Sequence, residues 1–298
     1  MKKILITGNS GYIGSHLTKM LQDEYEVHGL DINPPQLLPK THHKIDIRKL
    51  FNIEEEYDAV IHLAALVNVG ESEQIPIQYY ITNLNGTMNV INKVKTKNFI
   101  FASTGAAEGC ASAYGISKRA AEDCVVEFCV RHKPTPYTMF RFYNVIGSSY
   151  GIKPTNPDGL MYNLLKAKDT GTFTIFGNDY VESKDGTCVR DYVHVNDIAR
   201  ALIHADTWIG TSITHPAPGH HQYNLGSGVG YSVKEIVDEF TKQVGNPRNI
   251  VYGPRRIGDP PYLVADNEKF QRDLFFQYKH NNLSEIIRSA WEYRNGRK

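Results

Sequence analysis

The sequence predicts an α/β protein, with a doubly wound parallel sheet in residues 1–148 and a smaller mixed α/β region in residues 149–298. Three observations predict this division. An apolar run at 4–6 leads directly into a turn with three glycines. Apolar, strand-like runs then alternate with helix-like stretches, which is typical of a parallel sheet with helices on both faces. Beyond residue 148 prolines, glycines and tyrosines become frequent, which indicates a second, less regular domain that closes over the strand ends.

The first strand and the first helix enclose the glycine turn. Residues 4–6 form the apolar run that a buried parallel strand needs, and Ile13, Leu17 and Leu21 repeat with helical spacing. Glycines permit a tight turn that aims a helix N-terminus at an anion, and a dinucleotide pyrophosphate is the anion that fits. The unit is therefore expected to be of the Rossmann type. Its predicted cofactor contacts are Gly8, Gly11, Tyr12, Ile13 and Gly14.

A second strand is predicted at 25–30, and Asp31 stands at its end. Asp31 lies about twenty residues past the loop, where a carboxylate can accept hydrogen bonds from both hydroxyls of an adenosine ribose. No lysine or arginine occurs between Asp31 and Lys40, so a 2′-phosphate would meet a carboxylate without a nearby cation. The sequence therefore predicts NAD rather than NADP, with Asn33 as a further contact.

The next two strands end in further candidate contacts. Residues 43–47 predict a short strand that ends in Asp46 and Ile47. This end suits an adenine contact and suits equally well a plain strand followed by a helix cap. Residues 58–63 predict another strand, and small residues at its end would let the backbone lie close to a ligand. The candidate cofactor contacts there are Leu63, Ala64 and Ala65.

The rest of the first region predicts two long helices and two strands. The helices are expected at 76–95, which carries Asn83, and at 112–131; the strands are expected at 98–103 and 134–142. In the second region helices are expected at 159–168, 195–205, 232–244, 267–275 and 283–294, strands at 173–176, 189–194 and 223–225, and a surface loop at 210–221. Segments around 190–205 are expected to pack back on the first domain.

Tyr114 and Lys118 are the candidates for chemistry. They lie four residues apart, hence on one face of a predicted helix, directly after a strand that ends at Thr104. A tyrosine needs its pKa lowered by about three units to act as a base near pH 7. A lysine ammonium about 5 Å away would supply on the order of 3 kcal/mol of that change. The arrangement indicates general acid–base catalysis of hydride transfer between a sugar hydroxyl and NAD, with Thr104 aligning the reacting hydroxyl.

Composition excludes several other classes. The net charge is +1, which gives no electrostatic reason to expect nucleic acid or a membrane surface as a partner. No apolar run approaches the about 18 residues of a membrane-spanning helix, and no leader sequence is expected at the N-terminus. The four cysteines lack metal spacing and are expected to be reduced thiols in a cytoplasmic protein. The pairs at 42–43 and 220–221 are expected to be loop histidines, and no metal centre is predicted.

These motifs closely resemble the extended short-chain dehydrogenase/reductase family, and within it the UDP-glucose 4-epimerases, also called UDP-galactose 4-epimerases. The resemblance spans nearly the whole chain. Its most specific parts lie at 7–16, 60–65, 69–72, 114–118, 175–180, 185–195 and 223–230. It implies that Tyr114 takes the proton of the sugar's 4-hydroxyl as hydride passes to NAD, and that the 4-keto sugar turns before both return.

The resemblance also implies further site residues and a quaternary state. Asp46, Ile47 and Asn83 would contact NAD, Lys118 and Tyr114 would serve both cofactor binding and catalysis, and Thr104 and Tyr114 would contact the sugar. Arg190 and Arg256 suit a diphosphate, although as residue types they suit surface ion pairs equally well. A homodimer that pairs the helices at 76–95 and 112–131 is expected. The implied substrate contacts in the second region are Asn144, Leu160, Thr174, Phe176, Arg190, Tyr192, Arg256 and Asp259.

Several positions depart from the family pattern and leave alternatives open. Val67 stands where a lysine often contacts NAD, Gly159 replaces a usual asparagine, and Phe142 replaces a usual tyrosine. Leu263 stands where a tyrosine limits bulk at the sugar's C2, so N-acetylated substrates are also expected. A 4,6-dehydratase would need an acid pair where Gly105 and Ala106 stand. The alternatives are a uronic-acid epimerase or decarboxylase of the same family and, in a different class, a non-catalytic NAD-binding sensor.

Overall fold

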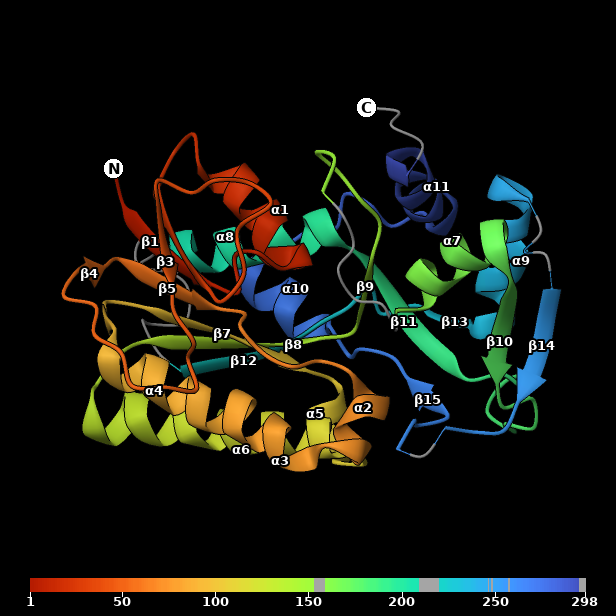
Figure 1. Ribbon diagram of the computed structural model, residues 1–298, viewed down its shortest axis with the longest axis horizontal. Coiled ribbons are helices and arrows are strands. Elements are labelled where there is room, and N and C mark those ends of the chain that lie inside the picture. The colour runs from red at the N-terminus through yellow and green to blue at the C-terminus, as the bar shows by residue number, and fades with distance from the viewer. Residues whose placement is uncertain (153–158, 209–219, 246, 248, 257, 295–298) are drawn as a thin grey trace.

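The computed structural model describes the chain except residues 153–158, 209–219, 246, 248, 257 and 295–298. Its main body is a seven-stranded, fully parallel sheet in the order β12-β8-β7-β5-β1-β2-β3 (Figure 1). The strands are β1 (Lys3–Thr7), β2 (Glu26–Asp31), β3 (Thr41–Lys44), β5 (Ala59–His62), β7 (Phe99–Thr104), β8 (Tyr137–Phe142) and β12 (His220–Leu225). The predicted α/β fold with a Rossmann-type parallel sheet is confirmed.

Helices cover both faces of this sheet, which explains why its strands read as continuous apolar runs. In β1, Ile4 and Ile6 pack into one core, whereas Leu5 between them packs into the other. The first core lies under α1 (Tyr12–Leu21), α8 (Val195–Trp208) and α10 (Glu268–Leu274). The opposite face carries α2 (Val69–Gln74), α3 (Pro76–Tyr79), α4 (Gly86–Lys93), α5 (Ala106–Gly109) and α6 (Ala113–Glu127), as Figure 1 shows.

The remaining elements form a second, smaller body with its own core. Two parallel strands, β10 and β14, stand beside a mixed sheet in which β11 pairs with β9, β13 and β15. The strands are β9 (Asn144–Ile146), β10 (Thr172–Phe176), β11 (Val189–His194), β13 (Gly230–Ser232), β14 (Asn249–Gly253) and β15 (Tyr262–Leu263), and the helices are α7 (Leu160–Thr170), α9 (Val233–Val244) and α11 (Leu283–Arg294). A separate small ladder joins β4 (Glu56–Tyr57) to β6 (Lys95–Thr96).

The two long helices of the first region are present but contain π-helical turns. The segment predicted at 76–95 runs through α3, a π-helical turn η1 (Tyr80–Asn85) and α4, and it ends at Lys93 because the chain then enters β6. The segment predicted at 112–131 starts at Ala113, with the Ser112 hydroxyl accepting a hydrogen bond from the Gly115 amide at 3.1 Å. It ends in a second π-helical turn, η2 (Phe128–His132).

Two expectations about strands need correction. The strand expected at 43–47 lies at Thr41–Lys44, so Asp46 and Ile47 follow it rather than end it. Of the loop expected at 210–221, residues 210–219 lie outside the described residues, and 220–221 belong to β12. The histidine pairs at 42–43 and 220–221 therefore lie in strands, not in loops. Each pair sits in an edge strand of the main sheet, where propensity is a weak guide.

Chain topology crosses the predicted domain boundary. The strand β12 completes the main sheet beside β8, and α8 packs beside α1 on its face. The division at residue 148 stays a prediction. Among the described residues, no helix is both long and apolar enough to cross a membrane. The four cysteines are free thiols, of which Cys129 and Cys188 are buried.

Candidate active site

The glycine turn after β1 forms a backbone cradle at the N-terminus of α1. Gly8 has a φ of +74°, and a Cβ placed there would lie 2.8 Å from the backbone nitrogen of Ala64. A Cβ on Gly14 would lie 2.2 Å from the Gly8 carbonyl oxygen. Gly11 is the N-cap of α1 and provides no side-chain hydrogen bond to the helix. The backbone amides of the first helical turn, which point toward this cradle, are therefore not capped by a side chain. Only glycine fits these positions, and the cradle suits the pyrophosphate of a dinucleotide.

Asp31 stands at the carboxyl end of β2, beside the cradle. Its carboxylate accepts hydrogen bonds from the backbone amides of Ser10 at 3.2 Å and Asn33 at 2.9 Å. The Ser10 hydroxyl donates to the Asn33 carbonyl oxygen at 2.8 Å. These bonds tie the glycine turn to the end of β2, and they place a half-buried acceptor where the ribose of a dinucleotide is expected.

Asp46 and Ile47 have other partners in this structure. Arg48 binds the Asp46 carboxylate through its Nε at 2.9 Å and a terminal nitrogen at 2.8 Å, which holds the pKa of Asp46 below its usual value. Ile47 is buried against Gly86, where a Cβ would lie 2.6 Å from its side chain. The Asp46 carboxylate is therefore already paired with a cation, and Ile47 is part of the core.

The segment after β5 lies against the cradle and is bound to two helices. The Leu63 and Ala64 amides donate to the Thr7 carbonyl and hydroxyl oxygens at 3.1 and 3.2 Å. Asn83, in the π-helical turn, is fully buried; it accepts from the Leu66 amide at 2.8 Å and donates to its carbonyl at 3.0 Å. Ala64 and Ala65 thus follow β5 beside the glycine turn. Asn83 holds the chain just beyond them, and it also donates to Ser117 in α6 at 3.0 Å.

Tyr114 and Lys118 lie on one face of α6, and Thr104 ends the neighbouring strand β7. All three side chains are buried. Burial raises the pKa of Tyr114 to about 12, against a smaller lowering by a hydrogen bond with Thr104. Burial likewise lowers the pKa of Lys118 to about 7, and its Nζ lies 4.1 Å from the centre of the Phe101 ring. The pKa of Tyr114 is therefore raised rather than lowered as expected, because desolvation by burial is its largest cause.

A buried ion pair supports this helix, and sequence reasoning missed it. Glu122 accepts from the Ser103 hydroxyl at 2.6 Å and binds Arg141 through two parallel hydrogen bonds of 2.8 and 2.7 Å. Both charged side chains are buried. The only signal in the sequence is that Glu122 lies four residues after Lys118, one turn along the same face. The pair clamps α6 against the strands that end at Thr104 and Phe142.

The second body brings together the other candidate residues. Arg190 in β11 is paired with Asp259, and the Arg256 guanidinium lies 3.9 Å from the centre of the Phe176 ring. Tyr192 is buried in β11 and is in register with Asn144 of β9. The Asn144 amide donates to the Asp191 carbonyl at 3.1 Å. Of the two other candidates, Leu160 begins α7 and Thr174 lies in the middle of β10.

The two groups of residues approach each other at the start of α6. A Cβ on Gly258 would lie 3.0 Å from the Ala111 carbonyl oxygen and 3.3 Å from Ser112. The segment that carries Arg256 and Asp259 therefore lies against the chain three residues before Tyr114. Gly258 of the second body thus contacts the chain at the start of α6, near the carboxyl ends of the parallel strands, which is where open α/β sheets bind ligands.

The family model described as the NAD dependent epimerase/dehydratase family matches residues 4–226. The chain belongs to this family. A UDP-glucose 4-epimerase of Lactobacillus helveticus is 33% identical over 98% of this chain and 96% of its own. A UDP-arabinose 4-epimerase of Arabidopsis thaliana is 31% identical over 98% of this chain and 80% of its own. Family membership and NAD dependence, both expected from the motifs, are confirmed.

Solved structures agree over the full length. A UDP-glucose-4-epimerase from Stenotrophomonas maltophila, with bound NAD and formylated UDP-arabinopyranose, matches with a TM-score of 0.86 and 26% identity, covering 99% of this chain and 98% of its own. A UDP-Glc/GlcNAc 4-epimerase from Campylobacter jejuni matches with a TM-score of 0.77 and 28% identity, covering 99% and 100%. NAD is therefore the cofactor of this family member.

The positions that depart from the epimerase pattern lie in several different elements. Val67, which replaces the expected lysine, is 48% exposed just after the end of β5. Phe142 is buried at the end of β8, and Gly159 immediately precedes α7. Leu263 is in register with Arg190 and half-buried, whereas Tyr262 is 54% exposed. The expected alternation of these two side chains is thus present, with the leucine beside the candidate diphosphate-binding arginine.

Proposed function

We propose that the protein is a UDP-glucose 4-epimerase, which interconverts UDP-galactose and UDP-glucose. The observation that carries the proposal is the buried set of Thr104, Tyr114 and Lys118 at the carboxyl edge of a sheet whose first turn is a dinucleotide cradle. The relatives named as UDP-glucose 4-epimerases, which match nearly the whole chain, support the same assignment. The retained polar set argues against a non-catalytic NAD sensor.

The first domain would hold the cofactor through its backbone. Gly8, Gly11 and Gly14, with Tyr12 and Ile13 at the start of α1, would surround the pyrophosphate, and Asp31 would accept from the adenosine ribose. The rest of the NAD-binding path would be lined by Leu63, Ala64, Ala65 and Asn33. Asn83 would act mainly by fixing that path, because its amide is already bonded to Leu66 and Ser117. Asp46 would reach an adenine only beside its Arg48 partner.

The chemistry would take place at the Tyr114 hydroxyl. NAD, when bound, supplies the hydride acceptor and a positively charged ring. Tyr114 would accept the proton of the sugar's 4-hydroxyl and later return it to the opposite face of the turned 4-keto sugar. Since burial holds the tyrosine pKa at about 12, its ionised form needs positive charge nearby. Lys118, with a pKa of about 7, can supply this charge in its protonated form.

The second body would hold the nucleotide diphosphate. Arg190 and Arg256 would bind phosphate oxygens, with Asp259 orienting Arg190 and the Phe176 ring orienting Arg256. The other proposed substrate contacts are Asn144, Leu160, Thr174 and Tyr192. Because Leu263 replaces a bulkier tyrosine beside Arg190, we propose that N-acetylated UDP-sugars are accepted as well.

We also propose a cytoplasmic homodimer. Exposed apolar side chains gather on the helices that would form the interface: Ile77 at 69% in α3, Ile116 at 41% in α6 and Val130 at 43% in η2. The four free thiols suit a reducing compartment. Sedimentation velocity should give a dimer mass for the wild type and a monomer mass for Ile77→Asp with Val130→Asp. A wild-type monomer mass would contradict the interface.

The test of the activity is proton NMR of purified protein mixed with UDP-galactose and no added cofactor. The expected result is UDP-glucose that rises to an equilibrium mixture, because the resident NAD is regenerated in each cycle. Tyr114→Phe should lose at least about a hundredfold in rate while it retains NAD. Tyr137→Phe, at the amino end of β8, is the matched control and should remain active.

Failure would also be informative. If UDP-galactose is not converted without added cofactor but is converted after NAD is added, the result would indicate that the site retains NAD weakly, as expected from Val67. The proposed activity would stand. If UDP-galactose is not converted even with added NAD, whereas a UDP-uronic acid is converted, the assignment would be overturned in favour of the uronic-acid alternative. Inactivity on UDP-N-acetylglucosamine alone would overturn only the wider substrate range.

A further inference from the structure

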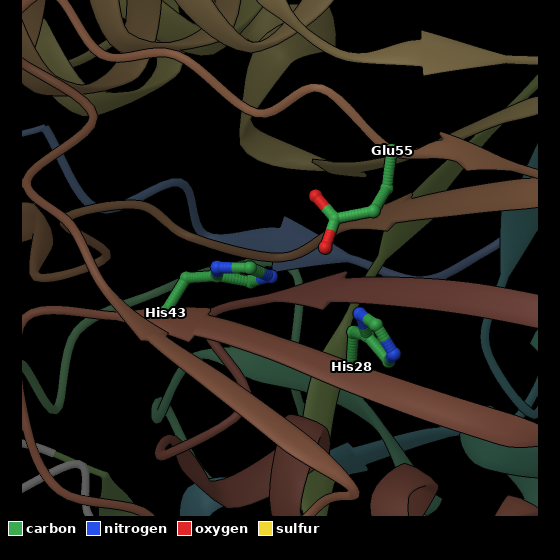
Figure 2. A group of neighbouring side chains, drawn as sticks. All are labelled: His28, His43 and Glu55. Atoms are coloured by element: carbon green, nitrogen blue, oxygen red, sulfur yellow. The ribbon is translucent and has the colours of Figure 1, made fainter.

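Two histidines and a glutamate converge at the outer edge of the main sheet. His28 lies in β2, His43 lies in the edge strand β3, and Glu55 directly precedes β4. One potential ligand atom from each of the three lies within 4.8 Å of the others. Figure 2 shows the Glu55 carboxylate directed into the space between the two imidazole rings. These three side chains are not among the residues proposed above for NAD or the UDP-sugar.

Strand geometry explains why the two histidines share a face. In the parallel register of β2 and β3, Leu30 pairs with His43 and His28 pairs with Thr41. Side chains alternate along each strand, so His28 lies on the same face as Leu30, and His43 lies on that face too. His42 points to the opposite face. The chain that leaves β3 then returns over this face and brings Glu55 to the rings.

Hydrogen bonds fix the orientation of His28. Its Nε2 lies 3.1 Å from one Glu26 carboxylate oxygen, and the other oxygen of that carboxylate forms an ion pair with Lys40 at 2.9 Å. An ionised carboxylate only accepts, so Nε2 carries the proton and Nδ1 keeps a lone pair. Histidines that bind metals usually donate their other N–H to a carboxylate in this way.

Both imidazole rings aim a nitrogen at the same point. His28 Nδ1 lies 3.1 Å from the Tyr57 hydroxyl oxygen, and His43 Nε2 lies 3.4 Å from it. A hydroxyl has a single proton, so the Tyr57 hydroxyl can donate to only one of these two nitrogens. A cation between the rings would instead take one lone pair from each ring.

The cluster opens onto a hollow that gives an ion access to it. The hollow has a volume of about 550 Å³ and is lined by His43, Asn52, Ile53, Glu54 and Glu55. Two of these five residues belong to the cluster. The hollow leaves room for water to complete a coordination shell, and the carboxylates of Glu54 and Glu55 give it a negative charge that attracts cations.

We propose that His28, His43 and Glu55 bind one divalent transition-metal ion, with Zn²⁺ as the best match. Two imidazole nitrogens and one carboxylate oxygen form a borderline donor set that favours Zn²⁺ over Mg²⁺ or Ca²⁺. In a tetrahedral site, ligand atoms about 2.0–2.2 Å from the ion lie about 3.3–3.6 Å from one another, so pairs that are near the 4.8 Å limit must move closer together. Glu55 can move most easily, because it is half-buried at the start of β4.

The ion would act as a structural clasp rather than in the reaction. It would join β2, β3 and the returning chain at Glu55, which encloses the segment from 45 to 54. That segment contains Asp46 and Ile47. A ligand that binds only the folded state raises its stability, so Zn²⁺ should raise the melting temperature by about 3 °C or more at saturating concentration. The rate of turnover should stay unchanged.

The test is calorimetric titration of ZnCl₂ into full-length, tag-free protein that has been dialysed against a chelator. The wild type should bind one Zn²⁺ per chain at micromolar concentration or below, and Mg²⁺ should not compete. His43→Ala and Glu55→Gln should each weaken binding at least tenfold and abolish the melting shift. His42→Ala, in the same strand but on the other face, is the matched control. His132→Ala controls for the exposed pair of His132 and Glu127.

Two outcomes would overturn the site. One is wild-type binding no tighter than that of the two cluster variants. The other is an equal loss in His42→Ala or His132→Ala, which would indicate scattered surface binding. Glu55→Gln is a half-buried, near-isosteric change, so it is expected to fold even if His43→Ala does not. The visible absorption of bound Co²⁺, strong only in four-coordinate sites, gives a readout independent of stability.

Discussion

Replacing Lys118 with methionine tests whether burial governs the electrostatics of the site. Burial lowers the pKa of this lysine from 10.5 to about 7 in the folded protein. Below pH 7 Lys118 is protonated in both the folded and the unfolded state, and its contribution to the stability of the fold is at its lowest. Between pH 7 and 10.5 the unfolded chain binds the extra proton, so the free energy of unfolding rises with pH. From pH 7 to 8.5 this lysine should add roughly 1–2 kcal/mol, because the full slope of 1.36 kcal/mol per unit is reached only above the folded-state pKa.

The assay is urea unfolding of NAD-free wild type and Lys118→Met at pH 7.0, 7.75 and 8.5. The wild type should gain roughly 1–2 kcal/mol of stability relative to the variant between pH 7 and 8.5, because methionine fills a similar volume without titrating. The variant should also lose turnover. Parallel pH profiles for the two proteins would refute the reasoning, since they would mean that the buried ammonium keeps its ordinary pKa in the fold.

Three further changes probe the cradle, the clamp and the phosphate site. Gly14→Ala places a Cβ 2.2 Å from a carbonyl oxygen and should cost at least tenfold in NAD affinity by fluorescence titration, whereas Gly109→Ala, with open space around it, should not. Glu122→Gln should lower the free energy of unfolding by about 1–3 kcal/mol, because it removes the buried carboxylate from Arg141 and leaves only the more exposed Glu108 to balance it; replacing Glu122 and Arg141 together by leucine and methionine should restore much of it. Arg190→Met should raise KM for UDP-galactose at least tenfold without changing NAD content.

Local signals sufficed for the sheet strands that are apolar on both faces. The run at 4–6, the glycine turn and the ends of β2 and β7 were all legible, because burial on two faces leaves a continuous apolar run. The edge strands were predicted only in part, at 43–47 for β3 and at 223–225 for β12. The sequence His220-His221-Gln222 carries no strand signal, and its pairing with β8 is decided by a partner more than 75 residues away. The strand β3 begins two residues and ends three residues before the predicted bounds of 43–47.

The candidate site could be predicted from the sequence where a single segment fixes the relative positions of its residues. The spacing of Tyr114 and Lys118 predicted their shared helix face, and the structure places Thr104 with them. Burial of these groups depends on elements from the whole chain, so their pKa shifts could not be read in advance. The ion pair of Glu122 with Arg141 and the hydrogen bonds of Asn83 with Leu66 are also contacts between distant segments. They join segments 17 or 19 residues apart, and no local pattern marks them.

The position of β12 has a consequence for synthesis on the ribosome. Until residue 225 emerges, β8 is the last strand of the sheet, and its outer row of amides and carbonyls has no neighbour. At about 5–20 residues per second, β8 waits roughly 4–16 s for its partner. A strand that is apolar on both faces and has an unpaired edge can pair with a strand of another nascent chain. A fragment that stops at residue 148 would keep that edge open permanently and should aggregate, whereas one that continues past Leu225 can close the sheet.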